Sequence, residues 1–367
     1  MIQKFIVCLL VLNGSGKIAG QKQCDECVFI NSCPKANDLQ TSSDSAIVQK
    51  FLESFCGFGI EAGVTRPKIC CNDFMKIETR SGADNEIHEN VGLLPDDCGK
   101  QYTDRIVGGT YADLYEYPWM ALLSYRSRGK KKPEFKCGGS IINSRYVLTA
   151  AHCVKDKILL GVRVGEYDIR QKKDCQGSDN CESHLQNIRI EETIIHEQYD
   201  PMNRSVTNDI ALIRVNNLIK FVGHKNVAPI CLPVWKNLRN INLSEEKATV
   251  AGWGLTEKGS PSSILKKVDV PVYNESACYK YLNRGSELDE DNPLIKTICA
   301  GGVIGKDSCN GDSGGPLMIQ KEYKESQIRE IQVGIVSYGP SQCGSNAPAV
   351  YTDVAKYVDW ILDHIKP

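Results

Sequence analysis

Three short motifs contain residue types suited to nucleophilic catalysis: Leu-Thr-Ala-Ala-His-Cys around His152, Asn-Asp-Ile-Ala-Leu around Asp209, and Asn-Gly-Asp-Ser-Gly-Gly-Pro around Ser313. A serine hydroxyl is a weak nucleophile at neutral pH, and histidine is the side chain whose pKa suits it to take the proton. That histidine needs a buried carboxylate, which fixes its tautomer and stabilises its charged form. We therefore predict that Ser313 attacks a carbonyl carbon, His152 acts as the base and Asp209 orients the base.

Taken singly, each of these residues also has an ordinary structural interpretation. His152 fits a core histidine, Asp209 a turn or cap residue, and Ser313 a serine in a glycine-rich turn. The segment around Ser313 also matches G-x-S-x-G, the nucleophile elbow of α/β-hydrolases, in which the serine precedes the acid and the histidine. The sole histidine after Ser313 is His364, three residues from the end, and the residues after Ser313 favour a strand over a helix. The joint pattern therefore favours a triad in the order His152, Asp209, Ser313.

The cysteine content and the first residues predict secretion. A basic residue precedes an apolar run, residues 5–12, which is followed by small and polar residues. This pattern is typical of a signal peptide over residues 1–20, cleaved after Gly16 or Gly20. Its removal takes Cys8 and leaves sixteen of the seventeen cysteines, an even number that suits a disulfide-bonded extracellular protein. No other run is long and apolar enough for a membrane helix, and a net charge of −1 predicts no nucleic-acid partner.

The rest of the chain divides into regions that differ in amino-acid composition. Residues 24–71 hold six cysteines in a segment too short to bury a sufficient core without disulfides. A zinc site is the alternative. It is disfavoured because Cys24-x-x-Cys27 is not matched by a second pair of cysteines with the same spacing. Residues 72–105 are polar and rich in turn formers, which predicts a linker, and His88 within it has no evident partner.

From residue 106 onward, short β-branched runs alternate with turn signals, a pattern typical of an all-β sandwich or barrel. The runs most typical of strands are residues 119–124, 140–142, 146–149, 162–164, 210–215, 249–253, 316–319 and 332–337. The period becomes helical over residues 352–365. The apolar residues at this spacing are Val354, Tyr357, Val358, Ile361 and Ile365. We predict a C-terminal amphipathic helix that packs on the β-domain.

With the three motifs in this order, residues 106–367 resemble the chymotrypsin-like serine protease family. Further matching stretches are Arg105-Ile106-Val107-Gly108-Gly109, Pro118-Trp119, Cys137-Gly138-Gly139-Ser140, Cys231-Leu232-Pro233, Ala251-Gly252-Trp253-Gly254 and Val350-Tyr351-Thr352. The resemblance implies an all-β fold of two six-stranded antiparallel β-barrels with a C-terminal helix. It also implies a trypsin-like serine endopeptidase that requires no cofactor, with the backbone N–H groups of Gly311 and Ser313 as its oxyanion hole.

The resemblance also assigns a specificity pocket. Asp307 corresponds to its floor, where a carboxylate binds the Arg or Lys side chain that precedes the scissile bond. Ser337, Gly339 and Ala349 correspond to its walls. Basic-specific members of the family carry glycine where this chain has Ala349. We therefore predict that the extra methyl narrows the pocket and makes Arg and Lys unequal as substrates.

The residues around Arg105 resemble a zymogen activation site. Cleavage after Arg105 frees the amino group of Ile106, which in this family pairs with the Asp beside the nucleophile, here Asp312. Such a buried pair orders the pocket and the oxyanion hole only after cleavage. The resemblance therefore implies an activator that is an upstream trypsin-like protease or the protein itself.

Residues 24–71 resemble the clip domain of arthropod clip-domain serine proteases, on six cysteines that end in Ile69-Cys70-Cys71 and on Phe51-Leu52 before Cys56-Gly57. Those proteases act in extracellular cascades of immunity, melanisation, clotting or embryonic patterning. The resemblance therefore implies a downstream zymogen or pro-ligand as protein substrate, and a serpin-type inhibitor. The disulfides implied by the two resemblances are Cys24–Cys70, Cys27–Cys56, Cys33–Cys71, Cys98–Cys231, Cys137–Cys153, Cys175–Cys181, Cys278–Cys299 and Cys309–Cys343.

Two kinds of additional site are expected. Asn203, Asn242 and Asn274 each begin an Asn-x-Ser glycosylation acceptor. Some relatives bind calcium in the loop that corresponds to Glu166 and Asp168, and the cysteine-bearing insertion that follows leaves the ligand set open here.

Two other functions compete with a cascade protease. A non-catalytic clip-domain homologue, which acts as a cofactor, usually lacks the nucleophile, whereas His152, Asp209 and Ser313 are all present. A digestive trypsin needs no docking module, so residues 24–71 disfavour that function.

Overall fold

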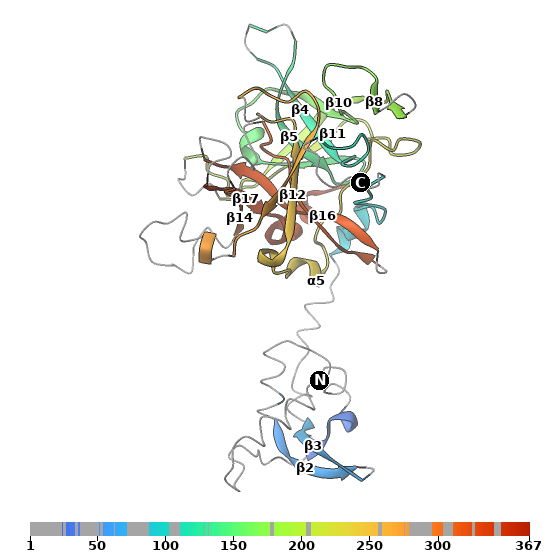
Figure 1. The fold of residues 1–367 in the computed structure, drawn as a ribbon, viewed down its shortest axis with the longest axis vertical. Helices are drawn as coiled ribbons and strands as arrows, with labels where there is room; N and C mark the ends of the chain where they lie inside the picture. Colours follow the sequence, from blue (N-terminus) through green and yellow to red (C-terminus); the bar gives the residue numbers. More distant parts are fainter. Residues whose placement is uncertain are drawn as a thin grey trace. The chain divides into compact units, whose positions relative to one another are not determined.

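A computed structural model gives the structure of the chain. It describes residues 24, 27–33, 36, 51, 54–61, 63–71, 88–102, 111–127, 129–130, 132–176, 180–202, 207–255, 259–274, 276–278, 296–303, 311–324, 327–340 and 346–367. The chain forms two compact units, Met1–Ile87 and His88–Pro367 (Figure 1). The predicted signal peptide lies outside the described residues.

The first unit is a three-stranded antiparallel sheet in the order β1-β3-β2. Its strands are β1 (Cys27–Phe29), β2 (Phe55–Glu61) and β3 (Val64–Cys70), and the 3-10 helix η1 (Ile30–Ser32) follows β1. The turn between β2 and β3 passes through Gly63, whose φ of +80° favours glycine. Ile30, Phe51 and Ile69 are buried. A core this small needs covalent support.

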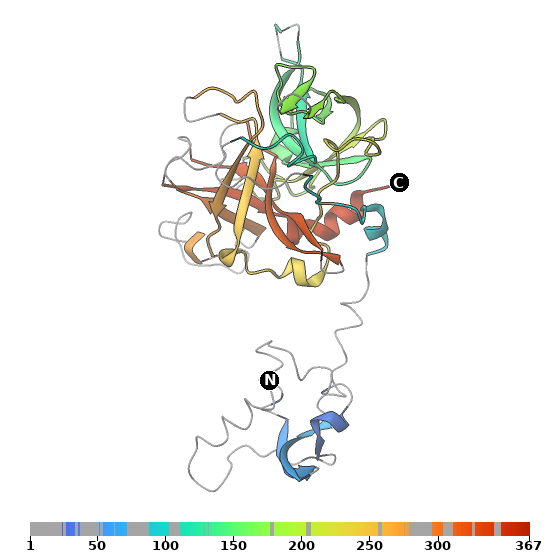
Figure 2. The same ribbon diagram turned by 45° about the vertical axis from the view of Figure 1, so that its right-hand side comes forward.

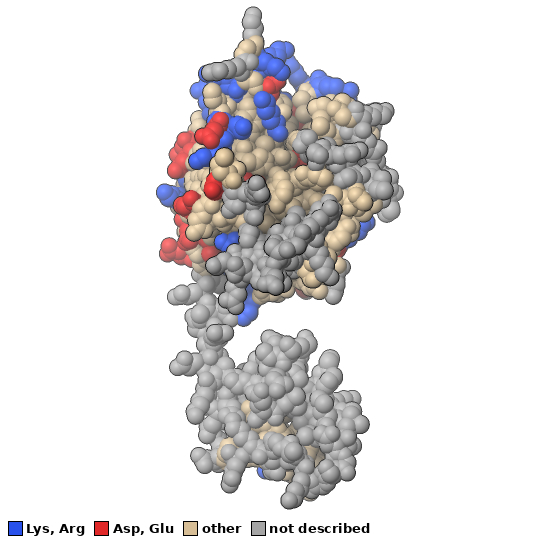
Figure 3. Space-filling view, turned by 90° about the vertical axis from the view of Figure 1, so that its left-hand side faces the viewer, with Lys and Arg blue, Asp and Glu red and all other residues tan. Residues whose placement is uncertain are grey.

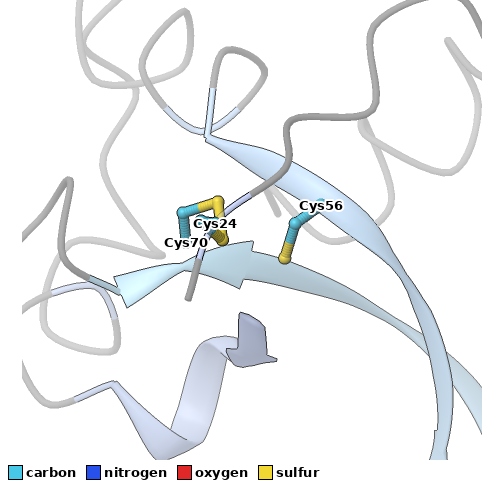
Figure 4. Close-up of side chains that lie close together, drawn as sticks. All are labelled: Cys24, Cys56 and Cys70. Atoms are coloured by element: carbon cyan, nitrogen blue, oxygen red, sulfur yellow. A yellow bond between two sulfur atoms is a disulfide. The ribbon is translucent and has the colours of Figure 1, made fainter. Parts of the chain in front are cut away.

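Three disulfides supply that support. They join Cys24 to Cys70, Cys27 to Cys56 and Cys33 to Cys71, with Cα–Cα separations of 5.9, 6.0 and 5.6 Å. These are the pairings that the clip-domain resemblance implies. Figure 4 shows the bonded sulfurs of Cys24 and Cys70, with Cys56 nearby. Zinc binds thiolates, and a disulfide sulfur is not a thiolate, so these cysteines do not form a zinc site.

The second unit contains a closed six-stranded barrel in the order β10-β11-β6-β5-β4-β7, with antiparallel neighbours throughout. Its strands are β4 (Met120–Tyr125), β5 (Glu134–Ile141), β6 (Tyr146–Thr149), β7 (Leu159–Val164), β10 (Gln186–Ile195) and β11 (Ala211–Val215). A separate hairpin of β8 (Asp174–Gln176) and β9 (Asn180–Glu182) carries the disulfide between Cys175 and Cys181.

Six further strands form a second antiparallel sheet in the order β13-β12-β15-β16-β17-β14. They are β12 (Lys247–Gly252), β13 (Lys266–Pro271), β14 (Thr297–Gly301), β15 (Pro316–Glu322), β16 (Ile328–Tyr338) and β17 (Pro348–Asp353). The two edges of this sheet meet at a bridge between Val272 and Ala300. The predicted all-β fold is confirmed, with a second barrel that is more open than the first; Figure 2 shows the two side by side.

Buried polar contacts join the barrel to the second sheet. The Trp119 indole nitrogen donates to the Met318 sulfur at 3.1 Å, and the Ser140 hydroxyl donates to the Gln332 amide oxygen. Buried polar groups need such partners, so each contact favours one placement of the two sheets. The residues of the predicted triad come from both sides of this junction.

The C-terminal segment is helical, as predicted, but in two steps. The 3-10 helix η8 (Val354–Tyr357) runs into α7 (Val358–His364), and the Asp353 carboxylate caps η8 by accepting from the Ala355 N–H at 3.0 Å. All five apolar residues of the predicted stripe are buried. The other described helices are η3 (Glu89–Leu93), η4 (Ala151–Cys153), α5 (Lys236–Arg239) and η5 (Leu243–Glu245). Within the described part of the chain, no helix has the length and apolarity to cross a membrane.

Residues 88–102, here called the anchor segment, pack on the second unit, although the sequence predicts a linker there. The helix η3 lies beside α7 (Figure 2), and the Asn90 side-chain amide donates to the Leu362 carbonyl at 2.9 Å. His88, for which the sequence shows no partner, lies with its Nε2 at 2.9 Å from Asp363 Oδ1.

The centre of the anchor segment is held covalently and by backbone hydrogen bonds. Cys98 forms a disulfide with Cys231. The Gly99 N–H donates to the Pro229 carbonyl at 2.8 Å, and the Gly99 carbonyl accepts from the Glu330 N–H at 2.9 Å. A β-carbon at Gly99 would lie 2.3 Å from the Glu330 carbonyl oxygen, so this close approach requires glycine.

Candidate active site

His152 lies on the 3-10 turn η4, directly after β6. Ala150 and Ala151 are fully buried, so their small side chains let the turn pack against the barrel. The disulfide between Cys137 and Cys153 ties the turn to β5, with a Cα–Cα separation of 6.1 Å. The His152 side chain remains 32% exposed, which leaves it accessible to a substrate.

Asp209 lies just before β11, and its side chain is fully buried. The preceding residue, Asn208, has a φ of +57°, a conformation that Asn adopts more readily than most residues. The Tyr357 hydroxyl on η8 donates to Asn208 Oδ1, and the Thr352 hydroxyl on β17 donates to the Asp209 carbonyl, both at 2.9 Å. The C-terminal elements therefore hold the chain in place at Asn208 and at the Asp209 backbone.

The Asp209 carboxylate binds His152 at two points. The His152 backbone N–H donates to Oδ1 at 2.9 Å, and His152 Nδ1 lies 2.8 Å from Oδ2. The Ser337 hydroxyl also donates to Oδ2. With Nδ1 bonded to Asp209, the other ring nitrogen, Nε2, is available to take a proton from a nucleophile.

The pKa of Asp209 lies below its ordinary value. Burial alone would raise this pKa, but the hydrogen bond and charge of His152, together with the Ser337 hydrogen bond, outweigh burial. The carboxylate therefore stays ionised at neutral pH and stabilises a protonated His152. The sequence predicts Ser337 as a pocket wall; its bond to Asp209, 128 residues away, is an additional role with no local sequence signal.

Ser313 lies just before β15, at the junction of the barrel and the second sheet. The Gly138 N–H on β5 donates to the Ser313 carbonyl at 2.8 Å. On the other side, the Gly314 N–H donates to the Val336 carbonyl on β16 at 2.8 Å. The backbone around the predicted nucleophile is therefore held by both sheets.

The structure brings Ser313 to the turn that carries His152. Gly314 has a φ of +79°, and a β-carbon there would lie 2.2 Å from the Thr149 hydroxyl and 3.2 Å from the Cys153 sulfur. That sulfur is 3.6 Å from His152 Nε2. Between these described residues, there is no hydrogen bond from the Ser313 hydroxyl to His152. Such bonds are often long before substrate binds.

The predicted oxyanion donors, Gly311 and Ser313, flank Asp312. Gly311 has a φ of +104°, and the Gly254 N–H donates to Asp312 Oδ1 at 2.8 Å. A β-carbon at Gly252 would lie 2.1 Å from Asp312 Oδ1, and one at Gly254 would lie 2.4 Å from Oδ2. The Ala-Gly-Trp-Gly motif therefore uses two glycines to make room for this carboxylate.

Two of the predicted pocket walls face each other. Gly339 follows β16, and Ala349 lies on β17 and is buried. A β-carbon at Gly339 would lie 3.3 Å from the Ala349 methyl carbon. The Ala349 methyl therefore points across the space between the walls. The predicted floor, Asp307, lies outside the described residues.

Several other predicted sites also fall outside the described part of the chain: Arg105, Ile106, Asn203 and the pair Cys309–Cys343. The structure does contain the expected disulfide between Cys278 and Cys299. The glycosylation candidates Asn242 and Asn274 are exposed, as glycan attachment requires.

The loop expected to bind calcium holds three buried carboxylates, Glu166, Asp168 and Asp174. Burial raises the pKa of Glu166 and of Asp174, and the negative charge of Asp174 raises the pKa of Glu166 further. Asp168, expected in this group, instead pairs with the Arg170 guanidinium through contacts of 2.9 and 2.7 Å. Carboxylate oxygens are the ligands that calcium prefers. Asp174 accepts from the backbone N–H groups of Tyr167 and Asp168, whereas Glu166 pairs with Arg163 at 3.1 Å, so an ion shared by Glu166 and Asp174 would compete with that guanidinium.

Together, the described residues are equipped for acyl transfer. His152 has one ring nitrogen bound to a buried carboxylate, and the Ser313 backbone is held beside the same turn. Proton transfer from Ser313 to His152 would generate the nucleophile, and Asp209 would stabilise the resulting imidazolium.

Several known proteins are similar to this chain over most of its length. The family model described as Trypsin matches residues 106–361. The Spaetzle-processing enzyme of Drosophila melanogaster is 37% identical, over 93% of this chain and 89% of its own length. The CLIP domain-containing serine protease HP8 of Bombyx mori is 38% identical, over 99% of this chain and 98% of its own length. A crystal structure of the Drosophila Grass clip serine protease of the Toll pathway is similar at a TM-score of 0.64 and 32% identity, covering 92% of this chain and 93% of that chain.

Proposed function

Because the chain belongs to the trypsin-like serine proteases of the clip-domain family, we propose that it is a secreted zymogen that cleaves a downstream protein after Arg or Lys. Peptide-bond hydrolysis by a serine endopeptidase follows from the family. The activation bond is Arg105–Ile106, the new amino group of Ile106 pairs with Asp312, and Asp307 binds the substrate's basic side chain.

An extracellular cascade is the setting that the relatives favour. One is named for processing Spaetzle, and another is described as a protease of the Toll pathway. The seven described disulfides suit an oxidising compartment. The substrate is accordingly a zymogen or pro-ligand in a pathway of immunity, melanisation, clotting or development. An upstream protease activates the chain, and a serpin-type inhibitor ends its activity.

The buried Asp209 carboxylate, 2.8 Å from His152 Nδ1, carries this proposal, because it prepares the His152 ring to take the proton of Ser313, the residue that non-catalytic homologues usually lack. The test is to cleave the purified chain after Arg105 and assay Arg and Lys peptides, with Ser313→Ala as the blank. We expect hydrolysis by the cleaved wild type and none by the variant. A correctly cleaved, folded chain that hydrolyses no peptide would instead support a binding protein.

The Ala349 methyl is expected to make the enzyme discriminate between Arg and Lys. One carbon in a tight pocket changes transition-state binding by about 1–3 kcal/mol, or roughly 10- to 200-fold. Replacing Ala349 with Gly removes the methyl that points towards Gly339. We expect the ratio of kcat/KM for matched Arg and Lys peptides to change by about tenfold. An unchanged ratio would show that Ala349 does not set specificity.

We also propose that Glu166 and Asp174 bind calcium. Their raised pKa values mean that the folded, ion-free protein binds protons more tightly than the unfolded chain. The free energy of unfolding therefore falls as the pH rises through these folded-state pKa values, and a bound cation would offset that loss. The stabilisation by calcium should thus be larger at neutral than at acid pH.

Thermal unfolding with calcium, magnesium or a chelator tests this site. A ligand at about one hundred times its Kd adds about 2.7 kcal/mol, which corresponds to several degrees in Tm. We expect this shift with calcium for the wild type and its loss in Glu166→Gln. Glu192→Gln, at an exposed carboxylate on the same barrel, is the control. Equal Tm values in calcium and chelator for the wild type would rule the site out.

A further inference from the structure

The loop between β4 and β5 concentrates positive charge. From Arg126 to Lys136, the sequence has six Lys or Arg residues and one acidic residue, in a chain with a net charge of −1. Figure 3 shows Lys and Arg side chains gathered at the uppermost end of the second unit, where this loop projects in Figure 1. A local excess of one sign attracts partners of the opposite sign.

A second loop extends the same surface. We define the basic ridge as the exposed residues Arg126, Lys130, Lys132, Lys136, Lys155 and Lys157. The last two follow η4, and the Arg126 N–H joins the loops by donating to the Ile158 carbonyl at 3.0 Å.

Two carboxylates lie among the described cations of the ridge, Glu134 and Asp156. Lys130 and Lys136 both pair with Glu134, and hydrogen bonds, first from Lys130 and then from Ser127, lower its pKa to about 2. Because six cations surround two carboxylates, the ridge keeps a net positive charge at neutral pH.

Both loops lead directly to the catalytic residues. Lys136 lies two positions before Gly138, whose N–H donates to the Ser313 carbonyl. A strand rises about 3.3 Å per residue, so Lys136 lies roughly 7 Å along β5 from that contact. On the other loop, Lys155 is three residues after His152, and its N–H donates to the Ala151 carbonyl at 2.8 Å. The ridge therefore begins beside the catalytic residues.

The position of the pocket decides which part of a substrate meets the ridge. Ala349 lies in β17 of the second sheet and Gly339 directly follows β16 of that sheet, so the residue before the scissile bond enters on that side. The barrel lies on the other side of Ser313, where the Gly138 N–H of β5 donates to the Ser313 carbonyl, so the residues after the scissile bond would leave towards the barrel that carries the ridge. We propose that the basic ridge binds an acidic segment of the protein substrate, located after the cleaved bond; this proposal rests on the proposed protease function.

A polypeptide fits this surface better than a sulfated glycan. The Ile158 side chain is 62% exposed between the two basic loops, and an apolar contact there suits an acidic peptide that also carries apolar residues. Opposite charges at such a surface raise association rates and fix the register of the bound chain.

Matched peptides test this proposal on the activated enzyme. Two internally quenched peptides share the residues up to the cleaved Arg and carry either a run of Glu or the same run of Gln after it. A short Arg substrate with only a reporter group after the bond measures basal activity. The variant combines Lys132→Glu, Lys155→Glu and Lys157→Glu. The control places the same charge change on the second sheet and η8, as Lys247→Glu, Lys321→Glu and Lys356→Glu.

We expect the wild type and the control to prefer the acidic peptide by about 10- to 100-fold in kcat/KM at low salt, with the preference shrinking as salt is added. The ridge variant should lose this preference and keep its activity on the short substrate. Three results would overturn the proposal: no preference in the wild type, equal losses on both peptides, or heparin binding without any effect on cleavage. A wild type inactive on the short substrate would contradict the protease function itself.

Discussion

Replacing Asp209 with Asn is expected to lower kcat on an Arg peptide about 10⁴-fold, with KM nearly unchanged. The carboxylate accepts the His152 backbone N–H, the His152 ring nitrogen and the Ser337 hydroxyl. An amide can offer one oxygen but also presents an NH₂ group, so the ring would favour the tautomer that cannot take the Ser313 proton. Steady-state kinetics of the activated enzyme measure the effect.

Ser337→Ala is the companion variant. It removes one hydrogen bond to a charged group, worth about 1.5–3 kcal/mol, so we expect a loss of about 10- to 100-fold in kcat. An Asp209→Asn enzyme that retains its Tm and loses less than about tenfold would show that Asp209 does not orient the base. A larger loss for Ser337→Ala than for Asp209→Asn would reverse the roles assigned to the two residues.

Blocking cleavage at Arg105 is expected to keep activity at least about 10³-fold below that of the cleaved enzyme. Losing one oxyanion donor costs about 10²–10³ in rate, and misplacement of the pocket adds to this loss. Asp312 lies between the predicted oxyanion donors Gly311 and Ser313 and is confined by the glycines that precede and follow Trp253. Any movement of its carboxylate towards a new ammonium therefore shifts both donors together.

The experiment compares Arg105→Gln with Arg105→Lys after treatment with a trypsin-like protease. Lysine still permits cleavage, so this variant should activate fully, whereas the glutamine variant should remain inactive. Asp312→Asn, cleaved normally, should stay about 10²- to 10³-fold below wild type. Full activity of uncleaved Arg105→Gln would show that the chain needs no activation.

The candidate triad could be proposed from the sequence because each of its members lies in a short local motif. His152 follows two alanines, Ser313 precedes two glycines, and the structure shows why: larger residues at 150, 151 or 314 would collide with the barrel, Thr149 or Cys153. Steric requirements of this kind place small residues at fixed positions beside the functional residue, where the sequence shows them directly.

Contacts between segments that are distant in the chain have no comparable signal in the local sequence. The Ser337 bond to Asp209 arises when β16 is placed beside the barrel, and the sequence predicts only a strand there. The anchor segment lacks periodicity because its contacts at Cys98 and Gly99 involve a disulfide and backbone groups. Such contacts depend on the fold of the whole second unit.

The strand β10 shows a third limit of sequence-based prediction. Most of its side chains are polar or only partly buried, and Ile188 is the one residue of the strand that is buried. Its stability comes from hydrogen-bonded pairing with both β7 and β11, which closes the barrel. Alternation of apolar and polar residues, the usual signal of a strand, is therefore weak here.

The anchor segment affects how well the cleaved protein can bind a target when the protein is dilute. After a cut at residue 105, the clip module would remain linked to the catalytic unit through Cys98–Cys231 and the hydrogen bonds of Gly99. The two modules then encounter a common target at an effective concentration set by the intervening chain, not by the amount of protein in the surrounding fluid. A target recognised by both modules would stay bound at concentrations where either module alone would release it.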